Sequence, residues 1–92
     1  MIEANELEYR ASLGNWDRVD EALGRNLDVN IRGVGGYTAM HAAAENGHLE
    51  VLRLLVSRGG TVDARTDEGQ TPLELGAGHP EIITFLRSVG GK

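Results

Sequence analysis

The sequence of 92 residues contains no cysteine, two prolines, and only one Trp, two Tyr and one Phe. Without cysteine it has no disulfide framework, no thiolate nucleophile and no thiolate metal site, which fits a reducing compartment. No segment approaches the roughly 18 consecutive apolar residues of a membrane span, and the first residues are acidic where a secretory signal would be basic. We therefore expect a cytoplasmic protein that binds no membrane.

Positive charge is also scarce in this chain. Nine Lys and Arg residues stand against 14 Asp and Glu residues, which gives a formal net charge of -5. The two signs are interleaved along the chain, and the acidic excess disfavours contact with phosphate backbones. The length suffices for one compact domain and is too short for two. We expect a single domain over residues 1–92 and no nucleic-acid partner.

A period of 33 residues runs through the sequence. Residues 38–41 recur at 71–74, and Val29 is matched by Val62 at the same distance. The same step backwards aligns Gly47 with Gly14 and Leu49 with Trp16. Internal repeats of this length are typical of solenoids, in which each unit buries its apolar side against the next one. The register predicts repeat 1 at about residues 5–29, repeat 2 at about 30–62 and a shortened repeat 3 at about 63–92.

The middle copy closely resembles the ankyrin repeat. Between Gly36 and Gly59 it has the family's Thr and His at the start of a first helix, paired alanines, a Gly-His step and an apolar second helix. The third copy matches from Gly69 onwards, whereas the first copy keeps only the second half of the pattern. The resemblance implies an all-α ankyrin-repeat solenoid of three helix-turn-helix repeats with short β-hairpin fingers.

The same residues make physical sense as helix signals. Thr38 and Thr71 stand where a threonine hydroxyl can accept from free amides of a first turn, and Pro72 then occupies a position where a missing N–H costs nothing. A run of three alanines at 42–44 makes a thin helix that a neighbour can approach closely. Helix ends are expected in the left-handed conformation at the following glycines: Gly14, Gly47, Gly59, Gly78 and Gly90.

The third copy departs from the period. Gly47 to Gly78 is 31 residues while Thr38 to Thr71 is 33, so its first helix should span about one and a half turns. Arg87 replaces an apolar position, as a capping repeat would require. We expect a complete small array, because Met1 leads directly into a divergent, polar first copy. A piece of a longer array is the alternative.

The resemblance implies that partner proteins dock on the fingers, at about residues 29–37 and 62–70, and on the inner face of the first helices. Tyr and Arg are common anchors of protein interfaces, so the centre of the site is expected at Arg32, Val34, Tyr37 and Asn46. Tyr37 packing along its own finger remains the alternative. The full set of expected contact positions is Arg32, Val34, Gly35, Tyr37, Glu45, Asn46, Arg65, Asp67, Glu68 and Gln70.

Catalysis has little support in the sequence. His41, His48 and His79 match positions where the family uses histidine to tie loops and neighbouring repeats together, and zinc and phosphate-loop motifs are absent. We therefore expect a non-catalytic, monomeric binding module without cofactor or metal. An inhibitor or immunity-type protein that occludes one enzyme, a self-assembling array and, remotely, a metal-dependent hydrolase are the alternatives. Trp16 aligns with a packing position and Leu13 with a surface position.

Overall fold

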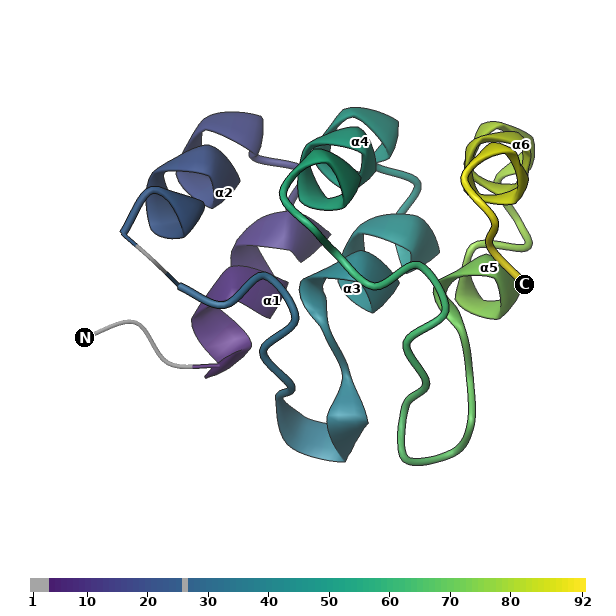
Figure 1. Cartoon of the computed structure of the whole chain (residues 1–92), viewed down its shortest axis with the longest axis horizontal. Helices are drawn as coiled ribbons and strands as arrows, with labels where there is room; N and C mark the ends of the chain where they lie inside the picture. Colours follow the sequence, from purple (N-terminus) through teal and green to yellow (C-terminus); the bar gives the residue numbers. More distant parts are fainter. Residues whose placement is uncertain (1–3, 26) are drawn as a thin grey trace.

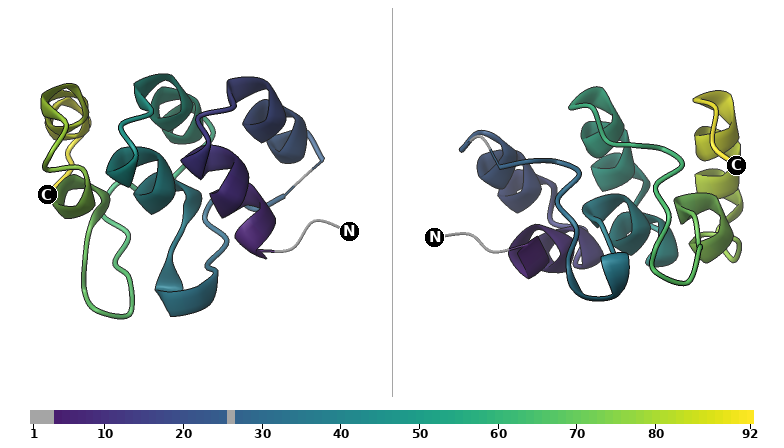
Figure 2. Two further views of the ribbon diagram at one scale, coloured as in Figure 1. Left: turned by 180° about the vertical axis from the view of Figure 1, so that it is seen from behind. Right: turned by 60° about the horizontal axis from the view of Figure 1, so that its bottom comes forward.

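The computed structural model describes residues 4–25 and 27–92, which form three helix pairs standing side by side in a row (Figure 1). The first helix of each pair, called the inner helix, lies next to the loops that project from one edge. The second helix, called the outer helix, lies along the opposite edge (Figure 2). This arrangement confirms the predicted all-α solenoid. The helices are α1 (Ala4–Ser12), α2 (Trp16–Leu23), α3 (Ala39–Glu45), α4 (Leu49–Ser57), α5 (Pro72–Leu75) and α6 (Pro80–Ser88), with a 3-10 turn η1 (Val34–Gly36).

The inner helix α3 is the most enclosed element of the described chain. It packs against α1 on one side and α5 on the other. All residues from Ala39 to Ala44 are buried, as the run of small side chains predicts. The outer helices complete the core, to which α1 contributes Leu7, and its fully buried aliphatic side chains larger than alanine are Leu7, Val19, Val51, Leu52, Leu55, Ile82 and Leu86. The core is therefore formed jointly by all three helix pairs.

The predicted helix starts are confirmed. The Thr38 hydroxyl accepts from the N–H of His41, and the Thr71 hydroxyl accepts from the N–H of Glu74. Both threonines are 1% exposed, so the capping hydroxyls lie inside the fold, and each satisfies an amide that has no partner within its helix. Pro72 is the first residue of α5, where its missing N–H removes no helical hydrogen bond.

Two histidines join successive repeats. The Nε2–H of His48 donates to the carbonyl of Ser12 (3.0 Å), and that of His79 donates to the carbonyl of Glu45 (3.1 Å). Each ring lies against the glycine that ends the preceding inner helix, because a Cβ on Gly14 would be 2.5 Å from His48 and one on Gly47 would be 2.7 Å from His79. The structure thus confirms the expected tying role of these two side chains.

Gly78 corrects one of the predicted helix ends. Gly14, Gly47, Gly59 and Gly90 have positive φ, as expected, but Gly78 does not. The reason is the shortening of the third copy. In repeat 2 the N–H of His48 reaches back five residues to the carbonyl of Ala43 (2.9 Å), whereas the N–H of His79 reaches only three residues back to Gly76 (2.9 Å). The tighter connection has no place for a left-handed residue at Gly78.

The fingers correct a second detail, because the described residues contain no β-strand and hence no β-hairpin. Across its base each finger has one backbone hydrogen bond, from Gly33 N–H to the carbonyl of Tyr37 (2.7 Å) and from Thr66 N–H to the carbonyl of Gln70 (2.9 Å). Inside it lie only short turn bonds, such as those from Gly36 N–H to the carbonyl of Gly33 (3.1 Å) and from Gly69 N–H to the carbonyl of Thr66 (2.8 Å). Paired strands need a ladder of such bonds between extended segments. The fingers turn back too soon to form one.

The glycine–histidine contact between repeats predicts an unequal response to alanine. Gly47→Ala and Gly59→Ala both place a side chain at positive φ, which costs about 1–2 kcal/mol. Only Gly47→Ala also presses on the His79 ring, since no described atom lies within 4 Å of a Cβ at Gly59. We expect Gly47→Ala to lose about 1 kcal/mol more in urea unfolding. Equal losses in the two variants would contradict this role for Gly47.

Candidate functional site

The tips of the two fingers contact each other. The guanidinium of Arg32 lies 3.6 Å from the carboxylate of Asp67, and the N–H of Asp67 donates to the carbonyl of Gly35 (2.9 Å). Beside this junction the side chain of Val34 is 87% exposed. Three of the predicted contact residues, Arg32, Gly35 and Asp67, are thus brought together by the tertiary structure, and they hold Val34 out into solvent.

Gly36 makes this junction possible. Its φ is +75°, and a Cβ there would lie 2.5 Å from the Arg32 guanidinium and 2.8 Å from the backbone nitrogen of Asp67. Gly69 occupies the same position in the second finger at φ +79°, yet no described atom lies within 4 Å of its Cβ position. The first finger therefore needs its glycine both for conformation and for the approach of the second finger.

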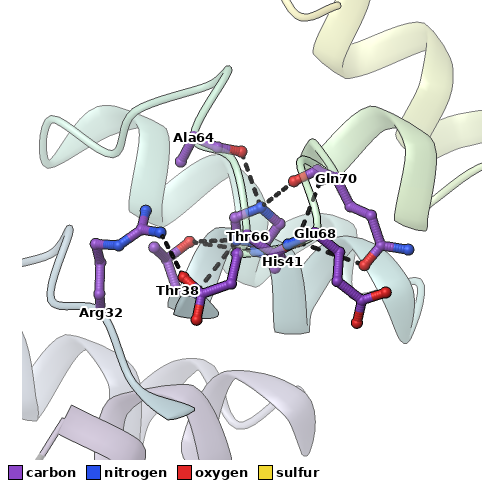
Figure 3. Close-up of polar contacts among 8 residues, drawn as sticks. Arg32, Thr38, His41, Ala64, Thr66, Glu68 and Gln70 are labelled. Atoms are coloured by element: carbon purple, nitrogen blue, oxygen red, sulfur yellow. Dashed lines mark hydrogen bonds and ion pairs between the residues drawn. The ribbon is translucent and has the colours of Figure 1, made fainter. Parts of the chain in front are cut away.

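His41 anchors the second finger to α3 (Figure 3). Its Nε2–H donates to the carbonyls of Ala64 (2.8 Å) and Gln70 (2.9 Å), while Nδ1 accepts from the N–H of Thr38 (3.2 Å). The neutral ring fits these partners, because its Nδ1 can accept from the Thr38 N–H and from the Thr38 hydroxyl, which lies 2.9 Å away. Burial lowers the pKa of His41, although its hydrogen bonds to the two carbonyls act in the opposite direction. His41 therefore serves the structure, as the sequence predicts.

A difference between the fingers follows from one residue. In the second finger the Thr66 hydroxyl accepts from the N–H groups of Glu68 and Gln70, both at 3.2 Å. The first finger has Gly33 at the same position and forms the 3-10 turn η1 instead. The carboxyl group of Glu8 lies beside Gly33, where a Cβ would be in ordinary van der Waals contact with it at 3.4 Å.

A cavity of about 550 Å³ opens on the inner face, between α1, α3 and the base of the first finger. It gathers three predicted contact residues, Tyr37, Glu45 and Asn46. The Tyr37 ring is half-buried and lies with its centroid 5.6 Å from that of His41. The described residues that line the cavity are Glu6, Glu8, Tyr9, Ser12, Tyr37, Ala42, Glu45 and Asn46.

The cavity is electrically negative. Burial raises the pKa of the Tyr37 hydroxyl, and the negative charges of Glu45, Glu68 and Glu8 raise it further. Glu6 is already paired with Arg10, whose guanidinium lies 2.9 Å from its carboxylate. Glu8 and Glu45 are in none of the ion pairs formed among the described residues.

Glu8 is the most unusual group in this cavity. Its Oε2 atom is buried and has no hydrogen-bond partner among the described residues, and burial raises the pKa of the carboxyl group. At the same position of repeat 3, the Glu74 carboxylate accepts from the N–H of Thr71 (3.0 Å), and this bond lowers its pKa. Repeat 1 therefore carries a desolvated carboxyl group where repeat 3 has a satisfied helix cap.

The remaining predicted contact residues all lie on the second finger, and they differ in whether they bond within the protein or face solvent. Arg65 bends back to donate to the carbonyl of Gly69 (3.1 Å), and the backbone carbonyl of Gln70 is held by His41. Asp67 and Glu68 are exposed on the second finger. The predicted set thus forms two groups, one at the finger tips and one in the cavity, while Arg65 bonds within its own finger and the Gln70 carbonyl is bound by α3.

Sequence reasoning missed the contribution of α1 to the cavity, namely Glu6, Glu8, Tyr9 and Ser12. The available signal was the register, because a step of 33 residues places Tyr9 on Ala42 and Glu8 on His41. The repeat pattern is broken at both positions. Tyr9 is aromatic where repeat 2 has a small alanine, and Glu8 carries a carboxyl group where repeat 2 has a structural histidine. The first copy matches the pattern only in its second half, so family positions could not be carried over to α1.

Other kinds of site have no support in the described part of the chain. Residues 4–25 and 27–92 include no group of three His, Asp or Glu side chains placed to hold a metal ion. Within the same residues, no helix has the length and apolar character needed to cross a membrane.

Comparisons with known proteins agree with this architecture. A family model described as ankyrin repeats, in three copies, matches residues 7–91. Alpha-latrocrustotoxin-Lt1a from Latrodectus tredecimguttatus is 37% identical over 81 residues, which is 87% of this chain and 6% of the toxin. An ankyrin repeat-containing protein from Schizosaccharomyces pombe is 41% identical over 63 residues, covering 68% of this chain and 30% of that protein.

A further relative carries a description of its activity in its name. The NF-kappa-B inhibitor cactus from Drosophila melanogaster is 45% identical over 49 residues, which is 52% of this chain and 10% of that protein. The chain thus spans 30% or less of the length of each of these three relatives. The similarity concerns the repeats they share with this chain.

The buried His41 ring predicts a pH-dependent stability. Because its folded-state pKa is lowered, its stabilising effect is full above the unfolded-state pKa of about 6.5 and is lost as the pH falls towards the folded-state pKa. We expect His41→Gln to lose about 1–3 kcal/mol at pH 7.5 and to show a weaker fall in stability below pH 6.5. NMR titration of the ring checks the cause directly, and a His41 pKa at or above about 6.5 would contradict it.

The desolvated Glu8 predicts the opposite pH dependence. Because its folded-state pKa is raised, the ionised carboxylate costs stability at pH 7, and this cost disappears once the group is protonated in both states, below about pH 4. We expect Glu8→Gln to raise Tm at pH 7, with the gain shrinking towards pH 4. Glu50→Gln is the matched control, since Glu50 is 79% exposed on α4. A Tm gain that is equal in both variants would rule out desolvation as the cause.

Proposed function

The chain belongs to the ankyrin-repeat family, and we propose that it binds another protein through its finger tips and inner helix face and performs no chemistry of its own. Ankyrin repeats are in general protein-interaction modules. The observation that carries the proposal is the exposed Val34, which the contacts between Arg32, Gly35 and Asp67 hold at the tip of the first finger. A pre-ordered apolar side chain loses little entropy on binding.

Other exposed apolar side chains extend this surface towards the first repeat. Tyr9 on α1 and Leu13 directly after its end are 63% and 58% exposed. Trp16, at the start of α2, is 43% exposed and therefore lies outside the core, while Leu49 at the same register position is half-buried. Apolar side chains gathered on one part of a surface mark interaction sites more often than isolated ones do. The partner is therefore proposed to cover the first finger and α1 together.

The remaining features of the proposal rest on the sequence. We propose one domain over residues 1–92, with repeats at about 5–29, 30–62 and 63–92, acting as a monomer in the cytoplasm. The net charge of -5 supports a protein partner over nucleic acid or an anionic membrane. Occlusion of one partner enzyme is the second candidate, and the similarity to a protein named as an inhibitor favours it over simple tethering.

Val34→Asp tests the surface with little effect on the fold. Proteins captured from an extract of the source cells are identified by mass spectrometry, and the affinity of the purified partner is then measured by calorimetry. We expect Val34→Asp to weaken binding by about tenfold or more, because a carboxylate replaces an apolar anchor. The free energy of unfolding should change by no more than about 0.5 kcal/mol, as is usual for exposed positions.

Val89→Asp is the matched control, because Val89 is also exposed but follows α6 at the far end of the row. It should bind as the wild type does. Failure of the wild-type chain to capture any protein, or equal affinity of both variants, would overturn the proposal. Tyr37→Ala is less informative, since the half-buried Tyr37 ring also packs beside His41.

A further inference from the structure

We propose that the cavity between α1 and α3 receives a basic side chain, arginine or lysine, of the protein partner. This inference rests on the proposed function and names the chemistry of the group that enters. The cavity holds about 550 Å³, well within the range of about 300–1,000 Å³ typical of ligand pockets. Its walls combine carboxylates with tyrosine rings, and the argument follows from these two kinds of group.

Glu8 and Glu45 supply the charge. They come from different helices, α1 and α3, and both line the cavity. Glu6 contributes little, because Arg10 already neutralises it at 2.9 Å. The neighbouring Arg32 is engaged with Asp67 at the finger tips. Among residues 4–25 and 27–92, the lining includes no basic side chain, so a cation from outside would be the first to meet these two carboxylates.

The carboxyl group of Glu8 favours a charged donor. An ionised carboxylate can only accept hydrogen bonds, and the Oε2 atom of Glu8 is buried without a donor among the described residues. A guanidinium or ammonium group brings several N–H donors together with the opposite charge, and such charge-assisted bonds are stronger than neutral ones. A basic side chain in the cavity therefore places a positive charge beside a carboxylate that forms no ion pair among the described residues.

Tyr9 and Tyr37 favour an organic cation over a metal ion. Tyr9 is well exposed at the cavity, and Tyr37 forms part of its wall beside the first finger. The face of a tyrosine ring attracts a cation within about 6 Å of its centroid, and the aliphatic stem of Lys or Arg packs against the same ring. A bare metal ion would gain little from two aromatic walls.

The test is an NMR titration of the ¹⁵N-labelled chain with the peptide acetyl-Gly-Arg-Gly-amide. The matched peptide contains citrulline, which has nearly the same shape as arginine but no charge. We expect the arginine peptide to bind with a Kd of about 1 mM and to shift the amides of Tyr9, Ser12, Tyr37 and Asn46. The citrulline peptide should leave these signals unchanged, and a lysine peptide should shift the same set.

Variants assign the binding to the two carboxylates. Glu8→Gln and Glu45→Gln should each weaken the arginine peptide at least about threefold, whereas Glu50→Gln, which removes the same charge from α4, should not. Glu8→Gln should also be the more stable protein at pH 7, because it no longer buries a charge. A purely structural role for Glu8 would not combine higher stability with weaker binding.

Three outcomes would overturn the cavity proposal: no shifts up to about 10 mM peptide, equal shifts with citrulline, or equal weakening by Glu50→Gln. These results are separable from the proposed function. If a captured partner binds more weakly to Val34→Asp but equally well to Glu8→Gln and Glu45→Gln, the proposed finger surface stands and the cavity proposal is wrong. If the chain binds the arginine peptide specifically but captures no protein, the cavity proposal stands and the proposed function is wrong.

Discussion

The structure depends on a single constraint, which is that the central inner helix α3 must be enclosed by its neighbours on both sides. Every residue of α3 from Ala39 to Ala44 is buried between α1 and α5, so the core exists only when the repeats stand in a row. Small side chains permit the close approach, and the larger aliphatic groups of the outer helices fill the space beyond them. Because apolar burial has no direction, it does not by itself fix how one repeat sits on the next.

Directional hydrogen bonds supply that register. His48 and His79 each reach from one repeat to a carbonyl of the previous one, and His41 holds the second finger to α3 through two carbonyls. The rings of His48 and His79 fill space that glycine leaves open at the ends of the inner helices. The histidines are therefore part of the packing, and their pattern follows the repeat and not a reaction.

The proposed partner surface lies where the repetition is broken. Gly33 and Glu8 both depart from the pattern of the other repeats, and they lie next to each other in the structure. The result is a desolvated acid beside two tyrosines, an arrangement that costs stability and that the other repeats avoid. Binding sites commonly keep such locally unfavourable groups, because a ligand that satisfies them gains free energy in doing so.

The sequence by itself determined the three-fold repetition, the helix starts at Thr38 and Thr71, the short α5 and the roles of the histidines, because these depend on local chemistry and on a period that relates equivalent positions. The tertiary structure decided the rest. The loops close without strands, Gly78 is not left-handed, and Glu8 meets Gly33 while Arg32 meets Asp67. Such contacts join positions that are not equivalent in the repeat, so they depend on the path of each loop through space, and a period in the sequence carries no information about that path.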